Sequence, residues 1–361
     1  MMSYSLHLGR LFGIPLKVHW TFGILILWIF FRNLTIGGGS SQALWSVFFV
    51  LAIFVCVTLH ELGHALAARH YRIRTRDITL LPIGGVARLE AMPEKPLHEL
   101  WVAIAGPLVN FILAGLLALL VRYRPNPQDL EGIMTITGHN FLFNLLMVNL
   151  WLGLFNLLPA FPMDGGRILR ALLALRISRH RATRIAATLG QLLAIAFVVL
   201  GFFGNPFLVF IGLFIFLGAQ AEAEFVEAQW LLSGYRVADV MMRQFPTLQL
   251  TDTVQDAVRM LLNSQCRNFL VLNDGEPVGT LSRDEIIRAI SENKHTAPIE
   301  EVMNTHLLRL SAEQPLPEIW KFMQEDKHLA PVFEGQQLVG VVDPENIMEF
   351  IMIRGAELKT A

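Results

Sequence analysis

A pair of histidines lies at the end of a stretch that is apolar enough to cross a membrane. Residues 44–57 form this stretch, and His60-Glu61-x-x-His64 follows almost directly. On an α-helix, residues four positions apart share one face, so both imidazoles can reach one metal ion. Glu61 lies beside them, where its carboxylate can take a proton from a metal-polarised water. Ionisable groups are costly in such a segment, which indicates a functional site.

The composition places this motif in a membrane protein. Of 361 residues, 53% are hydrophobic and 16% are charged, and the mean hydropathy is +0.49. An ordinary soluble domain is less apolar than this. The net charge of −1 argues against a nucleic acid as partner. Cys56 and Cys266 lie in very different contexts, so a disulfide is not expected.

Apolar stretches of membrane-spanning length recur along the first two thirds of the chain. We expect about six transmembrane helices, near residues 14–31, 44–68, 97–121, 139–158, 185–203 and 207–221. Arginine-rich segments follow the second and the fourth stretch, at residues 69–76 and 167–184. Positive charge collects on the cytoplasmic side. The prediction is therefore a polytopic α-helical protein of the cell membrane, with both termini in the cytoplasm.

Several breaks and polar residues interrupt these stretches. Residues 77–90 consist of two short apolar runs around Gly84-Gly85, which predicts a hairpin that either offers an edge to an extended peptide or plugs the helix bundle. Gly106-Pro107 is expected to break the third helix, and Asn110 places an amide at membrane depth. The fourth stretch contains Asn156 and ends at two prolines, just before Asp164.

A zinc site needs a third protein ligand, and the residues leave several candidates. His70 has the spacing found in some soluble metalloproteases, but Ala67 stands where those proteins have a chain-turning glycine. His19 and His139 have no spacing argument. Asp164 offers an oxygen ligand at a broken helix end, next to two glycines that allow close approach. The structural alternative is that Asp164 caps the helix that follows.

The composition becomes that of a soluble domain after about residue 221. Two similar units follow, and their glycines Gly279 and Gly340 correspond at a spacing of 61 residues. Each unit is predicted to form a helix, a strand, a turn, a strand and a helix, so this part is an internal α/β repeat.

Three motifs together resemble those of the site-2 protease family, the intramembrane zinc metalloproteases of the peptidase M50 type. They occur in the family's order and spacing: His60-Glu61-Leu62-Gly63-His64, Gly106-Pro107-x-x-Asn110, and Asn156-x-x-Pro159 followed by Asp164-Gly165. Together with the C-terminal part, the resemblance covers nearly the whole chain. The two C-terminal units resemble a pair of CBS domains. The expected domains are a protease domain at residues 1–224, a helical linker at 225–236, and CBS domains at 237–296 and 297–361.

The resemblance implies a function and a set of site residues. One zinc ion would be held by His60, His64 and Asp164, with Glu61 as general base. Asn110 and Asn156 would lie near the substrate or the oxyanion, and Gly84-Gly85 resembles a hairpin that the family places beside its site. The implied activity is hydrolysis of peptide bonds within or near transmembrane segments of membrane-tethered proteins, modulated by cytoplasmic CBS domains.

The resemblance to CBS domains implies two kinds of partner, an adenine nucleotide and a second copy of the chain. CBS pairs often bind adenine nucleotides through a Gly-x-x-Ser/Thr-x-x-Asp pattern. The first unit has Ser282 and Glu285 in that pattern and the second has Asp343 and Asn346, so both depart from it. A homodimer formed through the CBS domains, or a substrate-docking role, is the alternative to nucleotide sensing.

A second class of function is compatible with the same features. A membrane transporter or channel, gated by its CBS pair and carrying a structural metal site, would also combine polar spans with a metal-binding motif. The sequence contains no second cluster of intramembrane charges that would form a path for ions.

Overall fold

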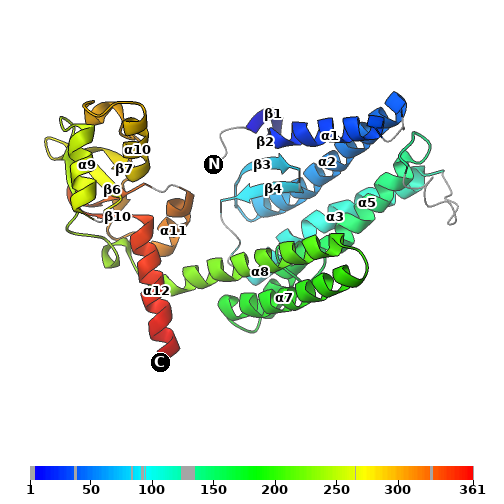
Figure 1. Cartoon of the computed structure of the whole chain (residues 1–361). Helices are drawn as coiled ribbons and strands as arrows, with labels where there is room; N and C mark the ends of the chain where they lie inside the picture. The colour runs from blue at the N-terminus through cyan, green and yellow to red at the C-terminus, as the bar shows by residue number, and fades with distance from the viewer. Residues whose placement is uncertain are drawn as a thin grey trace. The chain divides into compact units, whose positions relative to one another are not determined.

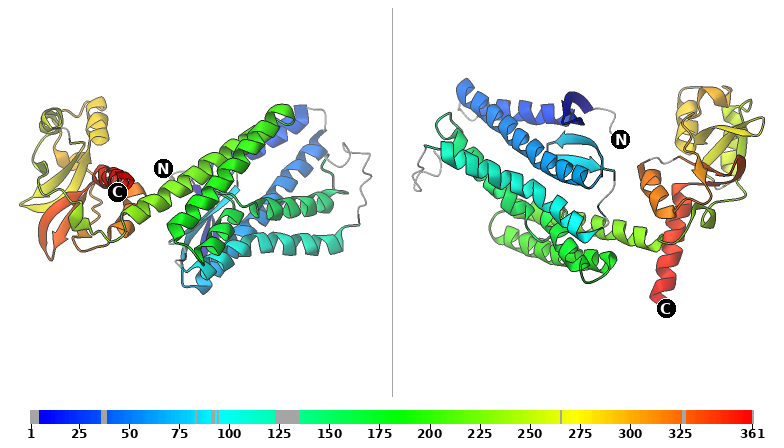
Figure 2. Two further views of the ribbon diagram at one scale, coloured as in Figure 1. Left: turned by 90° about the horizontal axis from the view of Figure 1, so that it is seen from below. Right: turned by 180° about the vertical axis from the view of Figure 1, so that it is seen from behind.

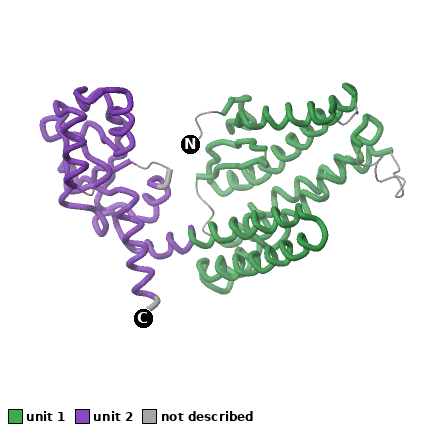
Figure 3. The backbone as a smooth tube through the Cα atoms, viewed as in Figure 1, with its two compact units in different colours: residues 1–224 green, residues 225–361 purple. Residues whose placement is uncertain are grey.

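The computed structural model describes residues 5–35, 39–82, 84–90, 93, 95–122, 135–264, 266–325 and 328–360. They belong to two compact units, Met1–Glu224 and Phe225–Ala361, which Figure 3 distinguishes by colour. Each unit is described by itself below.

The first unit is mainly helical (Figure 1). Among the described residues, four helices are long and apolar enough to cross a membrane: α2 (Gly39–His70), α3 (Pro96–Leu120), α7 (Arg179–Phe203) and α8 (Phe207–Leu231). Two shorter apolar helices are α1 (Thr21–Thr35) and α5 (Phe141–Asn156), and α6 (Asp164–Ala174) is a short amphipathic helix. A helical membrane protein is what the composition predicts.

The prediction that a membrane helix begins at residue 14 is wrong. Residues here form two antiparallel strands, β1 (Ser5–Leu11) and β2 (Ile14–His19), and α1 starts only after them. Phe12 and Gly13 join the strands with φ angles of 49° and 85°. Two successive residues with positive φ are typical of a tight hairpin turn whose twist matches that of the strands. The apolar residues here therefore belong to a sheet.

The predicted hairpin of residues 77–90 is present. Strands β3 (Thr75–Leu81) and β4 (Gly84–Leu89) pair antiparallel, and β3 also pairs in parallel with β2. The sheet order is β1-β2-β3-β4, so β4 is an edge strand. Ile14 and Ile78 of the sheet pack on Leu62 and Ala65 of α2. This packing holds the sheet against the helix that carries the histidines (Figures 1 and 2).

Helix α3 runs unbroken through Gly106-Pro107, contrary to the predicted break. A proline in a membrane helix is tolerated because neighbouring groups compensate for its missing N–H. Glycines in this region allow the backbones of α2 and α3 to approach each other closely. A Cβ on Gly63 of α2 would lie 2.8 Å from the Ala105 carbonyl oxygen of α3. Small residues of this kind let membrane helices pack backbone to backbone.

The predicted break after α5 is present. Helix α5 ends at Asn156, a turn containing Pro159 and Pro162 follows, and α6 begins at Asp164. Helices α7 and α8 then form an antiparallel pair in which glycines face the partner helix. A Cβ on Gly212 would lie 2.6 Å from the Ala194 carbonyl oxygen.

A buried ion-pair network joins four helices of this unit. Arg170 of α6 is fully buried, and it donates from Nε to Glu99 of α3 at 2.8 Å and from Nη1 to Glu222 of α8 at 2.5 Å. Arg179 at the start of α7 lies 3.7 Å from the same Glu99 carboxylate. Arg170 is thus an internal residue and does not contribute to the charge of the arginine-rich segment in which it lies.

The second unit contains the predicted repeat. Helix, strand, strand and helix follow one another twice, as α9 (Val254–Asn263), β6 (Asn268–Asn273), β7 (Glu276–Ser282) and α10 (Arg283–Ser291), and as α11 (Leu316–Glu325), β9 (Ala330–Glu334), β10 (Gln337–Val342) and α12 (Pro344–Thr360). Two short strands that the pattern did not predict, β5 (Thr247–Gln249) and β8 (Leu310–Ser311), complete the sheets β5-β6-β7 and β10-β9-β8.

The segment that precedes each repeat pairs with the other repeat. Met242, before the first repeat, forms an antiparallel bridge with Val341 on β10 of the second. Asn304, before the second repeat, forms one with Thr280 on β7 of the first. Each repeat therefore includes a segment that belongs in sequence to the other repeat, and the two repeats are not separate in space.

The packing of the two repeats follows the same exchange. A Cβ on Gly279 would lie 2.8 Å from the Asn304 carbonyl oxygen, and one on Gly340 would lie 2.8 Å from that of Met242. Val237 belongs to the core of the second repeat, and Ile299 belongs to the core of the first. The two corresponding glycines of the repeat are thus needed where the exchanged segments cross.

We expect Arg170→Leu to destabilise the first unit strongly. The substitution leaves the buried Glu99 carboxylate with only the more distant Arg179 and removes the ion-pair partner of Glu222, which costs about 3–5 kcal/mol. Unfolding can be followed in detergent by the reaction of a thiol-reactive fluorophore with buried Cys56, in a Cys266→Ser background. Arg184→Leu, at an exposed position of α7, is the control and should change stability by less than about 0.5 kcal/mol.

A second substitution separates the lost ion pair from a packing defect. Glu99→Gln removes the unpaired charge, so the Arg170→Leu/Glu99→Gln protein should recover part of the lost stability. Unfolding of Arg170→Leu at the wild-type temperature would contradict the importance of the network.

Candidate metal centre

Three polar side chains from two distant segments converge in the first unit. Asp164 Oδ2 lies 3.2 Å from His60 Nε2 and 3.1 Å from His64 Nε2, and the two Nε2 atoms are 3.1 Å apart. All three residues are buried. Within the described part of the chain, they are the group whose ligand atoms converge closely enough to hold one metal ion.

The opposite nitrogens of both imidazoles face oxygen atoms. His64 Nδ1 lies 2.7 Å from the Val102 carbonyl oxygen, and His60 Nδ1 lies 2.5 Å from Asn110 Oδ1. A carbonyl oxygen accepts hydrogen bonds and cannot donate one. Each Nδ1 therefore carries the ring proton, and each Nε2 presents a lone pair. A partner of this kind on the remote nitrogen is the usual way in which a ligating histidine is oriented.

These residues fit a zinc ion. Two imidazole lone pairs and a carboxylate oxygen, all acceptors, meet in a buried space, where only a cation balances them. Zinc bonds of about 2.0–2.1 Å at tetrahedral angles separate ligand atoms by about 3.3 Å. The observed separations of 3.1–3.2 Å are close to that spacing. Two histidines and one carboxylate also form a common ligand set of catalytic zinc.

Glycines make room for the convergence. A Cβ on Gly106 would lie 2.2 Å from His64 Nε2 and 2.7 Å from His60 Nε2, so no other residue fits beside the two rings. A Cβ on Gly165 would lie 2.1 Å from the Leu158 carbonyl oxygen. Gly165 thus allows the start of α6, with Asp164 as its first residue, to press against the preceding turn. Asp164 does not cap α6, because the capping position is Met163.

Glu61 lies between the histidine pair and the edge strand. Its Oε2 accepts a hydrogen bond of 3.0 Å from the Ala87 backbone N–H of β4. A Cβ on Gly85 would lie 2.8 Å from Glu61 Cγ and 2.9 Å from Val57 Cγ1. The glycine that the sequence placed in the hairpin is therefore needed where β4 passes over the glutamate.

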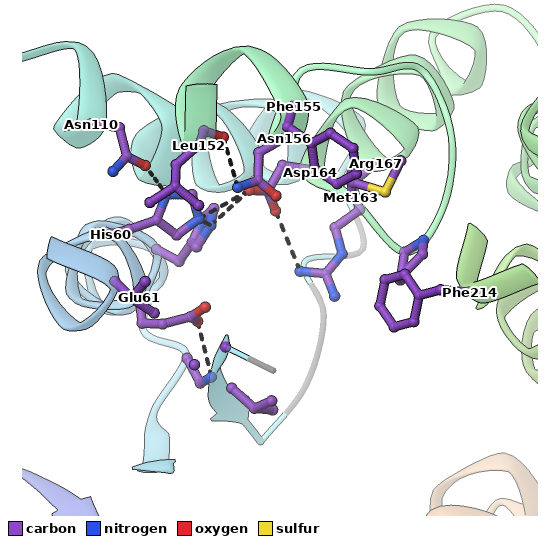
Figure 4. A pocket seen from close by; sticks show the side chains of 17 residues that line it. His60, Glu61, Asn110, Leu152, Phe155, Asn156, Met163, Asp164, Arg167 and Phe214 are labelled. Atoms are coloured by element: carbon purple, nitrogen blue, oxygen red, sulfur yellow. Dashed lines mark hydrogen bonds and ion pairs between the residues drawn. The ribbon is translucent and has the colours of Figure 1, made fainter. Parts of the chain in front are cut away.

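A cavity of about 450 Å³ joins these groups (Figure 4). It is lined by residues of α2, β4, α3, α5, α6 and α8 and of the turn before α6, among them His60, Glu61, His64, Gly84, Gly85, Val86, Ala87, Asn110, Asn156, Asp164, Arg167 and Phe214. Apolar walls surround a few convergent polar groups, which is typical of a small-molecule or peptide site.

The predicted substrate residues Asn110 and Asn156 both line the cavity, but their amides are differently engaged. Asn110 is fully buried and uses both ends of its amide, accepting from His60 and donating to Asn149 Oδ1 at 3.0 Å. These two contacts orient His60, and the second hydrogen of the Asn110 NH₂ group is left for the predicted contact with an oxyanion. Asn156 donates to the Leu152 carbonyl oxygen at 3.0 Å and is only partly buried.

The other histidines considered as ligands lie elsewhere. His19, His70 and His139 belong neither to the converging group nor to the cavity lining. His19 Nδ1 lies 2.7 Å from Thr21 Oγ1 at the start of α1. His70 is the last residue of α2.

Sequence reasoning missed Arg167, Asn149 and the true role of Gly106. Arg167 lines the cavity, with Nη1 4.0 Å from Asp164 Oδ1, and its Nε is buried without a hydrogen-bond partner. In the sequence analysis, Arg167 was part of the arginine-rich segment expected on the cytoplasmic side. Its position three residues after Asp164, on the same helix, was the available signal.

The residues expected at a nucleotide site are helix caps in the second unit. Ser282 and Glu285 form a capping box at the start of α10, in which Glu285 N donates to Ser282 Oγ at 3.3 Å. At the start of α12, Asn346 N donates to Asp343 Oδ1 at 2.9 Å. In return, the Ser282 and Asp343 backbone N–H groups donate to Glu285 Oε2 at 2.7 Å and to Asn346 Oδ1 at 3.2 Å, so all four side chains have a structural role.

Comparison with known proteins gives two family matches. Peptidase family M50 matches residues 48–126 and 124–200, and the CBS domain matches residues 237–292 and 299–353. Zinc metalloprotease MJ0392 of Methanocaldococcus jannaschii is 32% identical over 353 residues, which cover 98% of this chain and 97% of that protein. Putative zinc metalloprotease Rip3 of Mycobacterium tuberculosis is 30% identical over 375 residues, covering 97% and 93%.

A solved structure, the site-2 protease from Methanocaldococcus jannaschii, is 38% identical and covers 61% of this chain and 95% of that chain, with a TM-score of 0.46. The apolar helices, the buried centre and the sequence matches together define a membrane zinc metalloprotease. The chain belongs to peptidase family M50, as the resemblance of its motifs predicted, and it carries a pair of CBS domains.

We expect Gly106→Ala to abolish metal binding. The added methyl group must displace both imidazoles, so the zinc content of the purified protein should fall from about one ion per chain to near zero. Gly115→Ala on the same helix is the matched control, because a Cβ there meets no atom within 4 Å. Full zinc content in Gly106→Ala, measured by elemental analysis, would rule out the arrangement described.

Proposed function

We propose that this protein hydrolyses peptide bonds within or near the transmembrane segments of membrane-tethered proteins. The observation that carries the proposal is the convergence of His60, His64 and Asp164, with Glu61 beside them, in a cavity walled by an edge strand. Metal ligands, a proton carrier and a surface for an extended chain thus share one space. The relatives are named as zinc metalloproteases, which does not favour the CBS-gated transporter.

His60, His64 and Asp164 would hold the zinc ion. When bound, zinc supplies Lewis acidity toward a water molecule and toward the carbonyl group of the scissile peptide. Glu61 takes a proton from the attacking water and passes it to the amine nitrogen of the departing chain. The Ala87 N–H holds one oxygen of Glu61, so the carboxylate is positioned before substrate arrives.

Strand β4 is the surface on which we place the substrate. A peptide bond inside a helix is shielded by its own turns, so the cleaved segment has to unwind. An extended segment can add to the edge of a sheet and replace its helical hydrogen bonds with those of the strand. Gly84, Gly85, Val86 and Ala87 of β4 all line the cavity beside Glu61, which supports this placement.

Asn156 and Arg167 are assigned to the substrate carbonyl. Both line the cavity, and the side chain of Arg167 is 30% exposed, with its Nη1 4.0 Å from Asp164 Oδ1. A fixed cation near a developing oxyanion stabilises it strongly where water is excluded. Asn110, which also lines the cavity, keeps its predicted place near the oxyanion and in addition orients His60.

The arrangement in the membrane is also part of the proposal. Six spans result if the short helices α1 and α5 cross the bilayer with the four long ones. Arg179 Nη1 donates to the Pro93 carbonyl oxygen at 3.2 Å, so the segments following α2 and α6 meet at one end of the bundle. Positive charge at this end favours a cytoplasmic location for it, for both termini and for the CBS domains.

We assign a regulatory role to residues 225–361. The proposed division is a helical linker at residues 225–236 and two CBS domains at 237–296 and 297–361, with the exchanged segments described above. A homodimer through the CBS domains is the favoured partner arrangement. The helix caps formed by Ser282, Glu285, Asp343 and Asn346 support a structural use of those positions more than an adenine-nucleotide site.

We expect Glu61→Gln to retain zinc and to lose activity. The amide cannot accept the proton of the attacking water, so cleavage should fall by at least about 100-fold. The measurement is fragment release from a set of reporters, each with one transmembrane helix weakened by Gly and Pro between two fluorescent proteins. Cleavage by Glu61→Gln at the wild-type rate would remove Glu61 from this role.

We expect Asp164→Ala to lose metal affinity along with activity. One of three protein ligands is removed, so zinc should be stripped by a chelator at a concentration that leaves the wild type loaded. Glu61→Gln serves as the matched control, since it changes a neighbouring carboxylate that holds no metal in this proposal. Equal zinc retention by Asp164→Ala and the wild type would mean that another residue completes the site.

A further inference from the structure

Behind the metal centre, a row of buried polar groups connects His60 to the backbone of a helix that contributes no ligand. Asn110 of α3 donates from Nδ2 to Asn149 Oδ1 of α5, at 3.0 Å. Asn149 in turn donates from Nδ2 to the Leu145 carbonyl oxygen at 2.9 Å and to Cys56 Sγ at 3.3 Å. Asn110 and Asn149 are both fully buried.

The Leu145 carbonyl sets the direction of every hydrogen bond in this row. A backbone carbonyl can only accept, so the end of the Asn149 amide that faces it must be the NH₂ group. The oxygen of Asn149 then faces Asn110, which must present its own NH₂ group there. The oxygen of Asn110 is left facing His60 Nδ1, so that nitrogen carries the ring proton.

We propose that Asn149 is a positioning residue for the metal centre, which fixes the tautomer of His60 through Asn110. The inference rests on the proposed function, in which His60 Nε2 is a metal ligand. His64 needs no such row, because its Nδ1 faces the Val102 carbonyl directly. Both ligating imidazoles are thus set by a backbone carbonyl, one directly and the other through two amides.

The alternative orientation explains why the row matters. Without a fixed acceptor behind it, the Asn110 amide can rotate and present its NH₂ group to His60 Nδ1. The ring proton then moves to Nε2, where it blocks the lone pair that would bind metal. Loss of an outer partner of a ligating histidine typically lowers metal affinity by about 10–100-fold.

The test is a double-mutant cycle on the full-length protein in detergent, with Zn²⁺ and Co²⁺ as probes. Asn149→Leu keeps the side-chain size but removes the row, and should lower the affinity for both ions by about 10-fold and weaken the visible absorption of the Co²⁺ complex. In an Asn110→Leu background, Asn149→Leu should cause no further loss, because the link to His60 is already absent.

Two further variants keep the test decisive if Asn149→Leu folds poorly. Asn149→Asp places a carboxyl group in a buried site, where it stays protonated. Its hydroxyl donates to Leu145 and its other oxygen accepts from Asn110, so metal affinity should stay within about threefold of the wild type. Asn144→Leu, on the same helix, should leave metal affinity unchanged. Asn144 Nδ2 donates to the carbonyl oxygen of Asn140, the residue just before α5, at 3.2 Å.

The outcomes separate the inference from the proposed function. Wild-type affinity in Asn149→Leu, or losses that add in the double mutant, would overturn the role of Asn149 while leaving the metal centre intact. Absence of Zn²⁺ and Co²⁺ binding in the wild type would overturn both the metal centre and the inference. Loss in Asn149→Leu together with retention in Asn149→Asp would support the row as described.

Discussion

Three acceptor atoms facing one another inside an apolar helix bundle are the constraint on which the rest of the first unit depends. His60, His64 and Asp164 are buried, and their ligand atoms lie 3.1–3.2 Å apart. Without a cation such a cluster is repulsive, so the surrounding structure has to hold it together. Gly106 supplies the space and the buried Arg170 network fastens α6, which begins with Asp164, to α3 and α8.

A metal-binding motif alone does not account for peptide hydrolysis, and the proposed function also depends on the sheet. Strand β4 holds one oxygen of Glu61 and leaves its edge along the cavity, while the other strands anchor it to α2. In the function we propose, the helices provide the metal ligands and the strand provides the edge on which an extended chain is held. The helix bundle and the small sheet with its edge strand β4 are thus the two parts of the fold on which the proposed peptide hydrolysis depends.

Features carried by local patterns were predictable. Residue spacing predicts the histidine pair and the C-terminal repeat, and glycine or proline residues predict the β3–β4 hairpin and the break before Asp164. Features decided by neighbours were not. Pro107 suggested a broken helix because helix propensity does not register support from adjacent helices, and the partner of Asn110 depends on the placement of α5. The strands before α1 resembled a span because their apolar residues are as frequent as those of a membrane helix.

The exchange of segments between the two repeats has a consequence for the order in which the protein is made. Residues 237–242 leave the ribosome soon after α8, yet their core partners include residues of β9 and β10, which are made later. Val237 and Met241, which follow α8, therefore stay without these core partners until β9 and β10 have been made. A product truncated before β9 would leave Val237 and Met241 exposed to solvent. Exposed apolar side chains of this kind would let quality-control proteases recognise incomplete chains.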